Sequence, residues 1–142
     1  MEKLANKKAM LQYLEDVFPQ VNGKIEILKI DDSLALVKLR VSKADLRPGG
    51  TVSGPSMFLL ADVAFYIAVL GSIGKEPLAV TTNCSINFIR KPDPYDLVAE
   101  ARIFKQGRKL IVGDVSLTSG RGNELVAHAT FTYARPSKRS CQ

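Results

Sequence analysis

One acidic side chain stands inside a long apolar stretch of this chain. From Met57 to Leu70 every residue is apolar except Asp62 and Tyr66. Burying a lone carboxylate is costly unless the group is paired, neutralised or used in chemistry, and carboxylates in such surroundings are common at functional sites. We therefore take Asp62 as the candidate catalytic residue. The alternative is a hydrogen-bonded aspartate in packing or in a dimer contact.

The apolar stretch has the signals of a buried helix. Pro55 suits the first helical position, and Ser53 or Gly54 can cap the helix. Gly71 and Gly74 mark its end. The stretch is shorter than the about 20 apolar residues of a membrane span, and it carries a carboxylate midway. The pattern predicts a core helix wrapped by a sheet, and no membrane partner.

Extended patterns before and after this helix predict the sheet. Residues 4–18 are amphipathic and predict a peripheral N-terminal helix that ends at Pro19. Short turns favour a hairpin for the first two strands and an antiparallel meander for the last four. The fold is predicted as α+β, a curved antiparallel sheet of about six strands around one long central helix, in a single domain over residues 1–142. The predicted strands cover residues 24–31, 33–41, 78–91, 96–105, 110–119 and 125–133.

The strand over residues 78–91 alternates, and this alternation assigns its faces. Val80, Thr82, Cys84, Ile86 and Phe88 share one side, and the residues between them share the other. We take the first set as the inward face. A threonine on that face can contact the site or can simply fill the core.

Composition limits the class of protein and its partners. The chain has 142 residues, 46% of them hydrophobic, which is enough for one ordinary domain. Its two cysteines make neither a disulfide framework nor a metal site, and MEKLANKK is no secretory signal, so we expect a cytoplasmic protein without a metal. The net charge of +6 is scattered, which disfavours nucleic acid and leaves a small phosphorylated ligand or a solubilising surface.

The segment GTVSGPSMFLLADVAFYIAVL resembles the signature of the PaaI-like acyl-CoA thioesterases. That signature reads Gly, Thr, hydrophobic, His, Gly, Gly, with an acid nine positions after the His. Ser53 stands at the His place, Gly54 and Pro55 at the two Gly places, and Asp62 at the acid. VTTNCSINFIRKP is similar to the family's central strand, and GRKLIVGDVSL to its following hairpin. The order of elements resembles the hotdog fold.

The resemblance implies hydrolysis of an acyl- or aryl-CoA thioester. It makes Asp62 the general base or nucleophile and the Gly54 N–H the oxyanion donor, and it gives Thr82 the position that holds a water or the carboxylate. Eight residues of helix separate Gly54 from Asp62 by about 12 Å, so one carbonyl carbon cannot touch both. A two-fold dimer with antiparallel helices removes this conflict. The resemblance implies the same homodimer, often paired into a homotetramer.

Two replacements leave a second function open. Ser53 replaces the family's His, and Arg47 replaces an Asn six residues before it. A hotdog protein that binds a CoA ester without turnover, or serves as a scaffold, is therefore the alternative. A dehydratase is disfavoured because the single histidine, His128, is far from the helix in sequence, and we take it as structural.

Further residues are candidates for substrate binding. Coenzyme A is part of the substrate, and no other cofactor is expected. Its phosphates suit arginines and lysines after the third strand and in the next turn. The acyl group needs an apolar slot near the carboxylate. The predicted substrate-binding residues are Arg47, Phe58, Phe65, Tyr66, Arg90, Lys91, Arg108 and Lys109.

Overall fold

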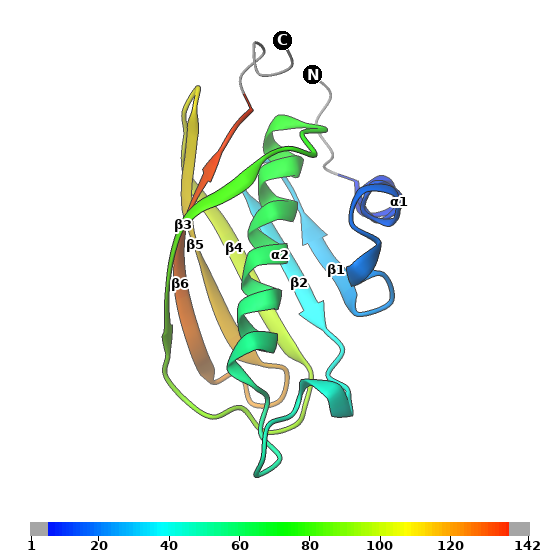
Figure 1. Cartoon of the computed structure of the whole chain (residues 1–142), viewed down its shortest axis with the longest axis vertical. Coiled ribbons are helices and arrows are strands. Elements are labelled where there is room, and N and C mark those ends of the chain that lie inside the picture. Colours follow the sequence, from blue (N-terminus) through cyan, green and yellow to red (C-terminus); the bar gives the residue numbers. More distant parts are fainter. Residues whose placement is uncertain (1–5, 137–142) are drawn as a thin grey trace.

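The computed structural model describes residues 6–136 and confirms the predicted α+β architecture (Figure 1). Six strands form one antiparallel sheet in the order β1-β2-β4-β5-β6-β3, and the sheet curves around helix α2. Helix α1 lies beside the sheet and packs on β1. The elements are α1 (Lys7–Val17), β1 (Ile25–Ile30), β2 (Leu34–Leu39), α2 (Gly54–Ile73), β3 (Val80–Phe88), β4 (Leu97–Gln106), β5 (Leu110–Ser119) and β6 (Leu125–Ala134), with short 3-10 turns at Pro19–Val21 and Lys43–Asp45.

Helix α2 is the predicted core helix. The Ser53 hydroxyl caps it by accepting the Ser56 N–H at 3.3 Å, and Pro55 follows in the first turn. The helix ends at Gly74, whose φ of 90° favours glycine. Its mean hydropathy of 1.9 and its length would suit a membrane span, but 83% of its apolar window is buried inside the fold. The sheet therefore supplies the apolar surroundings that the helix needs.

A buried carboxylate fixes the start of α2. Asp45 is only 3% exposed, and it accepts hydrogen bonds from Lys24 at 2.9 Å and from the Ser56 hydroxyl at 2.8 Å. The Ser42 N–H donates to the same carboxylate, and the Ser53 N–H donates to the Asp45 carbonyl. Burial alone raises the pKa of Asp45, but these hydrogen bonds and the Lys24 charge outweigh it and lower the pKa. Asp45 therefore holds the first turn as an ionised group.

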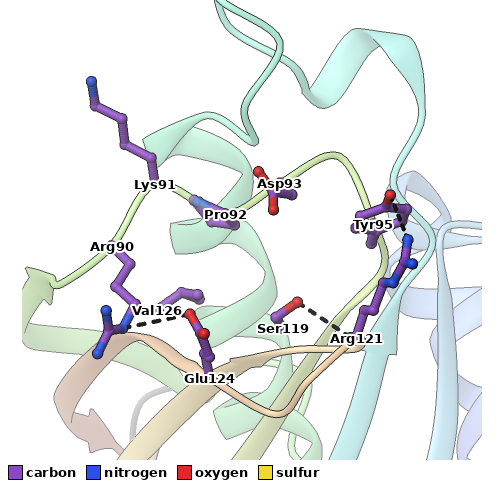
Figure 2. A pocket seen from close by; sticks show the side chains of 9 residues that line it. All are labelled: Arg90, Lys91, Pro92, Asp93, Tyr95, Ser119, Arg121, Glu124 and Val126. Atoms are coloured by element: carbon purple, nitrogen blue, oxygen red, sulfur yellow. Dashed lines mark hydrogen bonds and ion pairs between the residues drawn. The ribbon is translucent and has the colours of Figure 1, made fainter.

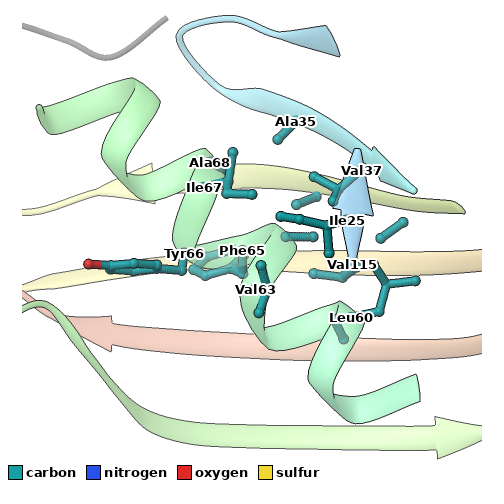
Figure 3. Packing of buried hydrophobic residues seen from close by; sticks show 14 of the residues in the cluster. Ile25, Ala35, Val37, Leu60, Val63, Phe65, Tyr66, Ile67, Ala68 and Val115 are labelled. Carbon is teal, nitrogen blue, oxygen red and sulfur yellow. The ribbon is translucent and has the colours of Figure 1, made fainter. Parts of the chain in front are cut away.

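Small residues of the sheet face the helix. The alanines of β4 at positions 99 and 101 are fully buried under α2. On the neighbouring strand β5, a Cβ on Gly113 would collide with Phe65 and with the Arg102 carbonyl. Phe65 itself stacks on Phe131 with ring centroids 5.3 Å apart. Figure 3 shows the α2 side chains, Phe65 among them, packed against the sheet.

The prediction of a four-strand meander is wrong. Strands β4, β5 and β6 are consecutive neighbours, but β3 pairs with β6 and β2 pairs with β4. Residues 89–96 cross the end of the sheet below α2 (Figure 1). This segment contains Pro92 and Pro94 and is too long for a tight hairpin, so it carries the chain from β3 past β6 and β5 to β4 in the interior of the sheet. The result is that β3 is an edge strand.

The assignment of Thr82 to the inward face is also wrong. The β3–β6 register shifts between Thr81 and Asn83, which marks a β-bulge. An extra residue in one strand gives the residues before the bulge the opposite phase from those after it. Thr81 consequently faces the helix, whereas Thr82 is exposed and donates to the Thr132 carbonyl at 3.1 Å.

Candidate active site

Asp62 lies midway along α2, half-buried, and its carboxylate is held from the sheet. The Thr81 hydroxyl donates to Asp62 Oδ1 at 2.7 Å, and the Tyr133 hydroxyl donates to the same oxygen at 2.9 Å. Tyr133 also reaches the Asp62 carbonyl at 3.2 Å. Since Oδ2 accepts none of these bonds, the carboxylate is oriented by one oxygen and keeps the second for other partners.

The groups around Asp62 remain protonated at neutral pH. Burial, and then the Asp62 charge, raise the pKa of Tyr133 far above its ordinary value of 10.0. Burial, and then nearby Tyr13, raise the pKa of Tyr66 to about 12. Burial and Asp62 together also raise the pKa of the Cys84 thiol. The hydroxyl of Tyr133 is therefore a lasting donor to the carboxylate, and Cys84 is a poor nucleophile.

A cavity of about 250 Å³ opens beside Asp62. We call it the Asp62 cavity. The end of α1 forms one wall, where Phe18 packs edge-on against Tyr66 with ring centroids 6.4 Å apart. The start of β3 and the end of β6 form the other wall. The lining residues are Val17, Phe18, Asp62, Tyr66, Pro77, Ala79, Val80, Thr81 and Tyr133. A hollow with both apolar and polar walls and one oriented carboxylate is suited to a small organic substrate.

A second cavity, of about 440 Å³, lies at the N-terminus of α2, and we call it the Gly54 cavity. Its surface is mostly apolar, and Met57 and Phe88 contribute to it. A helix N-terminus presents N–H groups and the positive end of the helix dipole, so this cavity can bind a carbonyl oxygen that gains negative charge. Arg47, Arg90 and Lys91 also line it.

The predicted site residues fall into separate groups. Tyr66 joins Asp62 at its cavity, while Arg47, Arg90 and Lys91 join Gly54 at the other. Phe58 is half-exposed on α2 and stacks on Phe131. Arg108 and Lys109 lie in the β4–β5 turn, at the end of the molecule opposite to the N-terminus of α2 (Figure 1).

Two predicted residues have structural tasks in this chain. Phe65 is fully buried between helix and sheet, so its proposed contact with the acyl group is wrong. The Ser53 hydroxyl is occupied as the helix cap, where it also donates to the Ser56 hydroxyl at 3.2 Å. Neither side chain can therefore approach a substrate without disturbing the core or the helix start.

The sequence interpretation missed Thr81 and Tyr133. Regular alternation along β3 assigns Thr81 to the outer face, and no local sequence pattern indicates the bulge that turns it inward. Tyr133 does lie on the inward face of β6 together with Ala127 and Ala129, so the alternation of that strand could have found it. His128 lies on the outer face of β6, where its Nε2 is 2.8 Å from Asp114.

Comparison with known proteins gives consistent matches. A family model described as the thioesterase superfamily matches residues 49–126, which include Gly54, Asp62 and Thr81. Acyl-coenzyme A thioesterase PaaI from Escherichia coli (strain K12) is 31% identical over 120 residues, covering 84% of this chain and 83% of PaaI.

Solved structures agree over nearly the whole chain. A candidate thioesterase from Silicibacter sp. TM1040 is 48% identical with a TM-score of 0.87, and the match covers 96% of each chain. A hypothetical thioesterase from Streptococcus pneumoniae TIGR4, solved with coenzyme A, is 27% identical with a TM-score of 0.75, covering 92% of this chain and 99% of that one.

Proposed function

This chain belongs to the thioesterase superfamily, and we propose that it hydrolyses an acyl- or aryl-CoA thioester at a site built by two copies of the chain. Its hotdog fold and its similarity to PaaI make it a thioester hydrolase. The observation that carries the more specific proposal is the Asp62 carboxylate, oriented by Thr81 and Tyr133 beside an open cavity.

Asp62 acts as general base or as nucleophile. As a base, it takes a proton from water while the water oxygen attacks the thioester carbonyl carbon. As a nucleophile, a carboxylate oxygen attacks the carbon and forms an anhydride, which water then opens. In both routes the carbonyl oxygen becomes an oxyanion, the carbon–sulfur bond breaks, and the CoA thiolate leaves and is protonated. The Gly54 N–H of the partner subunit stabilises the oxyanion.

The positions of the two cavities support a shared site. Within one chain, eight residues of helix put Gly54 about 12 Å from Asp62 along the axis. Thr81 of the Asp62 cavity and Phe88 of the Gly54 cavity stand at opposite ends of β3. A two-fold axis beside the exposed edge of β3, level with its middle, sets a second β3 antiparallel to the first, so it brings the Gly54 cavity of one copy toward the Asp62 cavity of the other.

The exposed edge of β3 supports the same pairing. Among exposed apolar side chains, Val80 is 55% and Phe88 is 52% exposed, and both belong to this edge strand. An edge strand also presents unpaired backbone N–H and C=O groups, which can pair with another strand. We propose that β3 of a second copy covers it, which gives a homodimer, and that two dimers associate into a tetramer.

Substrate contacts follow from this arrangement. Arg90 and Lys91 lie beside the Gly54 cavity, where they can meet CoA phosphates. The antiparallel pairing carries Arg108 and Lys109 of the partner subunit toward the same end. Tyr66 and the half-exposed Phe58 border the route of the acyl group.

One observation favours the alternative, a CoA-ester-binding protein without turnover. The Ser53 hydroxyl is engaged in capping α2, so it is not available to replace the side chain of the family's His. Calorimetry would favour this alternative if a CoA ester bound and no product formed over hours.

Hydrolysis of a panel of acyl- and aryl-CoA esters tests the proposed function. We expect Asp62→Asn to lower kcat/KM by about 10³-fold or more, the usual range for losing a catalytic acid or base. The matched control is Asp16→Asn, which removes an exposed carboxylate from α1. Equal rates for wild type and Asp62→Asn would remove Asp62 from the mechanism.

A further inference from the structure

A third cavity, of about 420 Å³, lies under the 89–96 connection and beside the β5–β6 turn (Figure 2). We call it the Arg121 cavity. We propose that it binds the phosphorylated adenosine end of coenzyme A, with Arg121 as the phosphate ligand and Tyr95 as its support. This inference rests on the proposed function, and it assigns to the β5–β6 turn a role in choosing the carrier of the acyl group.

The Arg121 cavity continues the Gly54 cavity. Arg90, Lys91 and Pro92 line both of them, so this short segment is a shared wall. The Phe88 ring lies 3.5 Å from where a Cβ on Gly54 would stand. Lys91 follows Phe88 by three residues, about 10 Å of extended chain. An apolar hollow at the helix N-terminus thus adjoins a polar one, which matches an apolar pantetheine arm followed by phosphates.

Arg121 is held in a defined position. Its guanidinium donates to the Tyr95 hydroxyl at 2.6 Å and lies 4.8 Å from the centroid of the same ring. Its backbone N–H donates to the Ser119 hydroxyl at 3.2 Å. Figure 2 shows the side chain rising from the β5–β6 turn toward Tyr95. Because a phenol is neutral, these contacts orient the guanidinium without cancelling its charge, which leaves it suited to a phosphate.

The other charges of the cavity favour a nucleotide over a simple phosphate. Two carboxylates, Asp93 and Glu124, line it as well. Glu124 lies 3.9 Å from Arg90, and both side chains are more than half exposed, so this ion pair is weak. Carboxylates repel phosphate but accept hydrogen bonds from ribose hydroxyls and from an adenine amino group. A ligand with phosphate, sugar and base satisfies both signs of charge.

This cavity would distinguish acyl-CoA from thioesters that end at pantetheine or at a carrier protein. The nucleotide binds away from the reacting carbon, so its contacts act on substrate binding. Losing them therefore raises KM and leaves kcat unchanged.

Kinetics and direct binding together test the proposal. We expect Arg121→Gln to raise KM for an acyl-CoA at least about tenfold, as for loss of a hydrogen bond to a charged group, with kcat and the rate on the matching acyl-pantetheine unchanged. In calorimetry, adenosine 3′,5′-bisphosphate is expected to bind wild type and to bind Arg121→Gln at least about tenfold more weakly. Lys29→Gln is the charge-matched control, because it removes one positive charge from β1 at the other edge of the sheet.

The outcomes separate this inference from the proposed function. Equal KM values for acyl-CoA in wild type and Arg121→Gln would overturn the assignment of the cavity, even with normal hydrolysis. Equal kcat/KM for acyl-CoA and acyl-pantetheine in wild type would overturn it too. Binding of the bisphosphate that depends on Arg121, without any thioester hydrolysis, would support the cavity and contradict the enzyme.

Discussion

The Thr81 hydroxyl donates to the Asp62 carboxylate across 2.7 Å, although Thr82 is the threonine that a regular strand would turn toward the helix. The β-bulge at this point therefore decides which of two adjacent, chemically identical side chains reaches the candidate catalytic group. As a result, the hydroxyls of Thr81 and Tyr133 both donate to Oδ1 of Asp62.

Replacing the two threonines separately tests whether Thr81, and not Thr82, supports Asp62. We expect Thr81→Val to lower kcat/KM by about 10- to 100-fold, the range for losing a hydrogen bond to a charged group. Thr82→Val, which removes only an exposed bond to the Thr132 carbonyl, should stay within about twofold of wild type. Steady-state kinetics on one acyl-CoA ester measures both variants. Similar losses in the two would show that the hydroxyls act through the stability of β3 and not through Asp62.

The architecture could be predicted because its signals are local. The apolar run around Asp62 and the Ser53–Gly74 boundaries specify α2 without any knowledge of its neighbours. The pairing of β3 with β6 could not be predicted in this way, since a connection through Pro92 and Pro94 reads equally well as a wide turn. Sheet order depends on which strand meets which around the helix, and no single segment contains that information.

The candidate site was predictable only in part, for a similar reason. Asp62 is conspicuous because its neighbours are apolar, but Phe65 and Tyr66 look alike in sequence. One helix turn of 3.6 residues spaces adjacent side chains by about 100°, so Phe65 enters the core while Tyr66 borders the cavity. The buried task of Asp45 depends on Lys24 and Ser56, which are distant in sequence, and it escaped prediction entirely.

Removing the charge of Asp45 should destabilise the fold near neutral pH. We expect Asp45→Asn to lower the free energy of unfolding by about 2 kcal/mol at pH 7, because Lys24 and the Ser42 N–H, which donate to this buried carboxylate, lose a charged acceptor. The folded pKa of Asp45 lies below its ordinary 3.8, so its contribution is present above that pH and is lost as the pH falls through the folded value. Urea unfolding from pH 7 to pH 3 measures the difference, with Asp16→Asn as control. A difference in free energy of unfolding between wild type and Asp45→Asn that stays constant down to pH 3 would contradict this role.

The buried hydroxyl of Tyr66 predicts a limit at alkaline pH. Its folded pKa is about 12 against an ordinary 10.0, so the unfolded chain loses this proton first. The contribution of Tyr66 to the free energy of unfolding is therefore complete below pH 10 and is lost as the pH rises toward 12, at up to about 1.4 kcal/mol per pH unit. The free energy of unfolding of wild type should therefore fall relative to Tyr66→Phe above pH 10. Between pH 7 and pH 9 the difference between the two proteins should be constant, and a difference that is also flat above pH 10 would contradict the assignment.

Mixing two inactive variants tests whether one site needs two chains. Gly54→Pro removes the proposed oxyanion donor and little else, because proline is favoured at the first helical position and Ser53 before it is extended. Gly54→Ala is its control, since it keeps the N–H and its Cβ meets Phe88 at an ordinary 3.5 Å. We expect Gly54→Pro and Asp62→Asn to be nearly inactive alone, and Gly54→Ala to be active.

Refolding the two inactive variants together in equal amounts should restore activity. Half of the dimers formed at random are mixed, and each mixed dimer joins one intact Gly54 to one intact Asp62, so about a quarter of the wild-type activity should return. A site contained in one chain predicts no recovery at all, because every chain then carries a damaged site. Thioester hydrolysis after co-refolding, with each variant refolded alone as reference, therefore decides between a shared and a self-contained active site. Size-exclusion chromatography of the same samples shows whether mixed dimers had the opportunity to form, since a population of monomers alone would contradict the shared site directly.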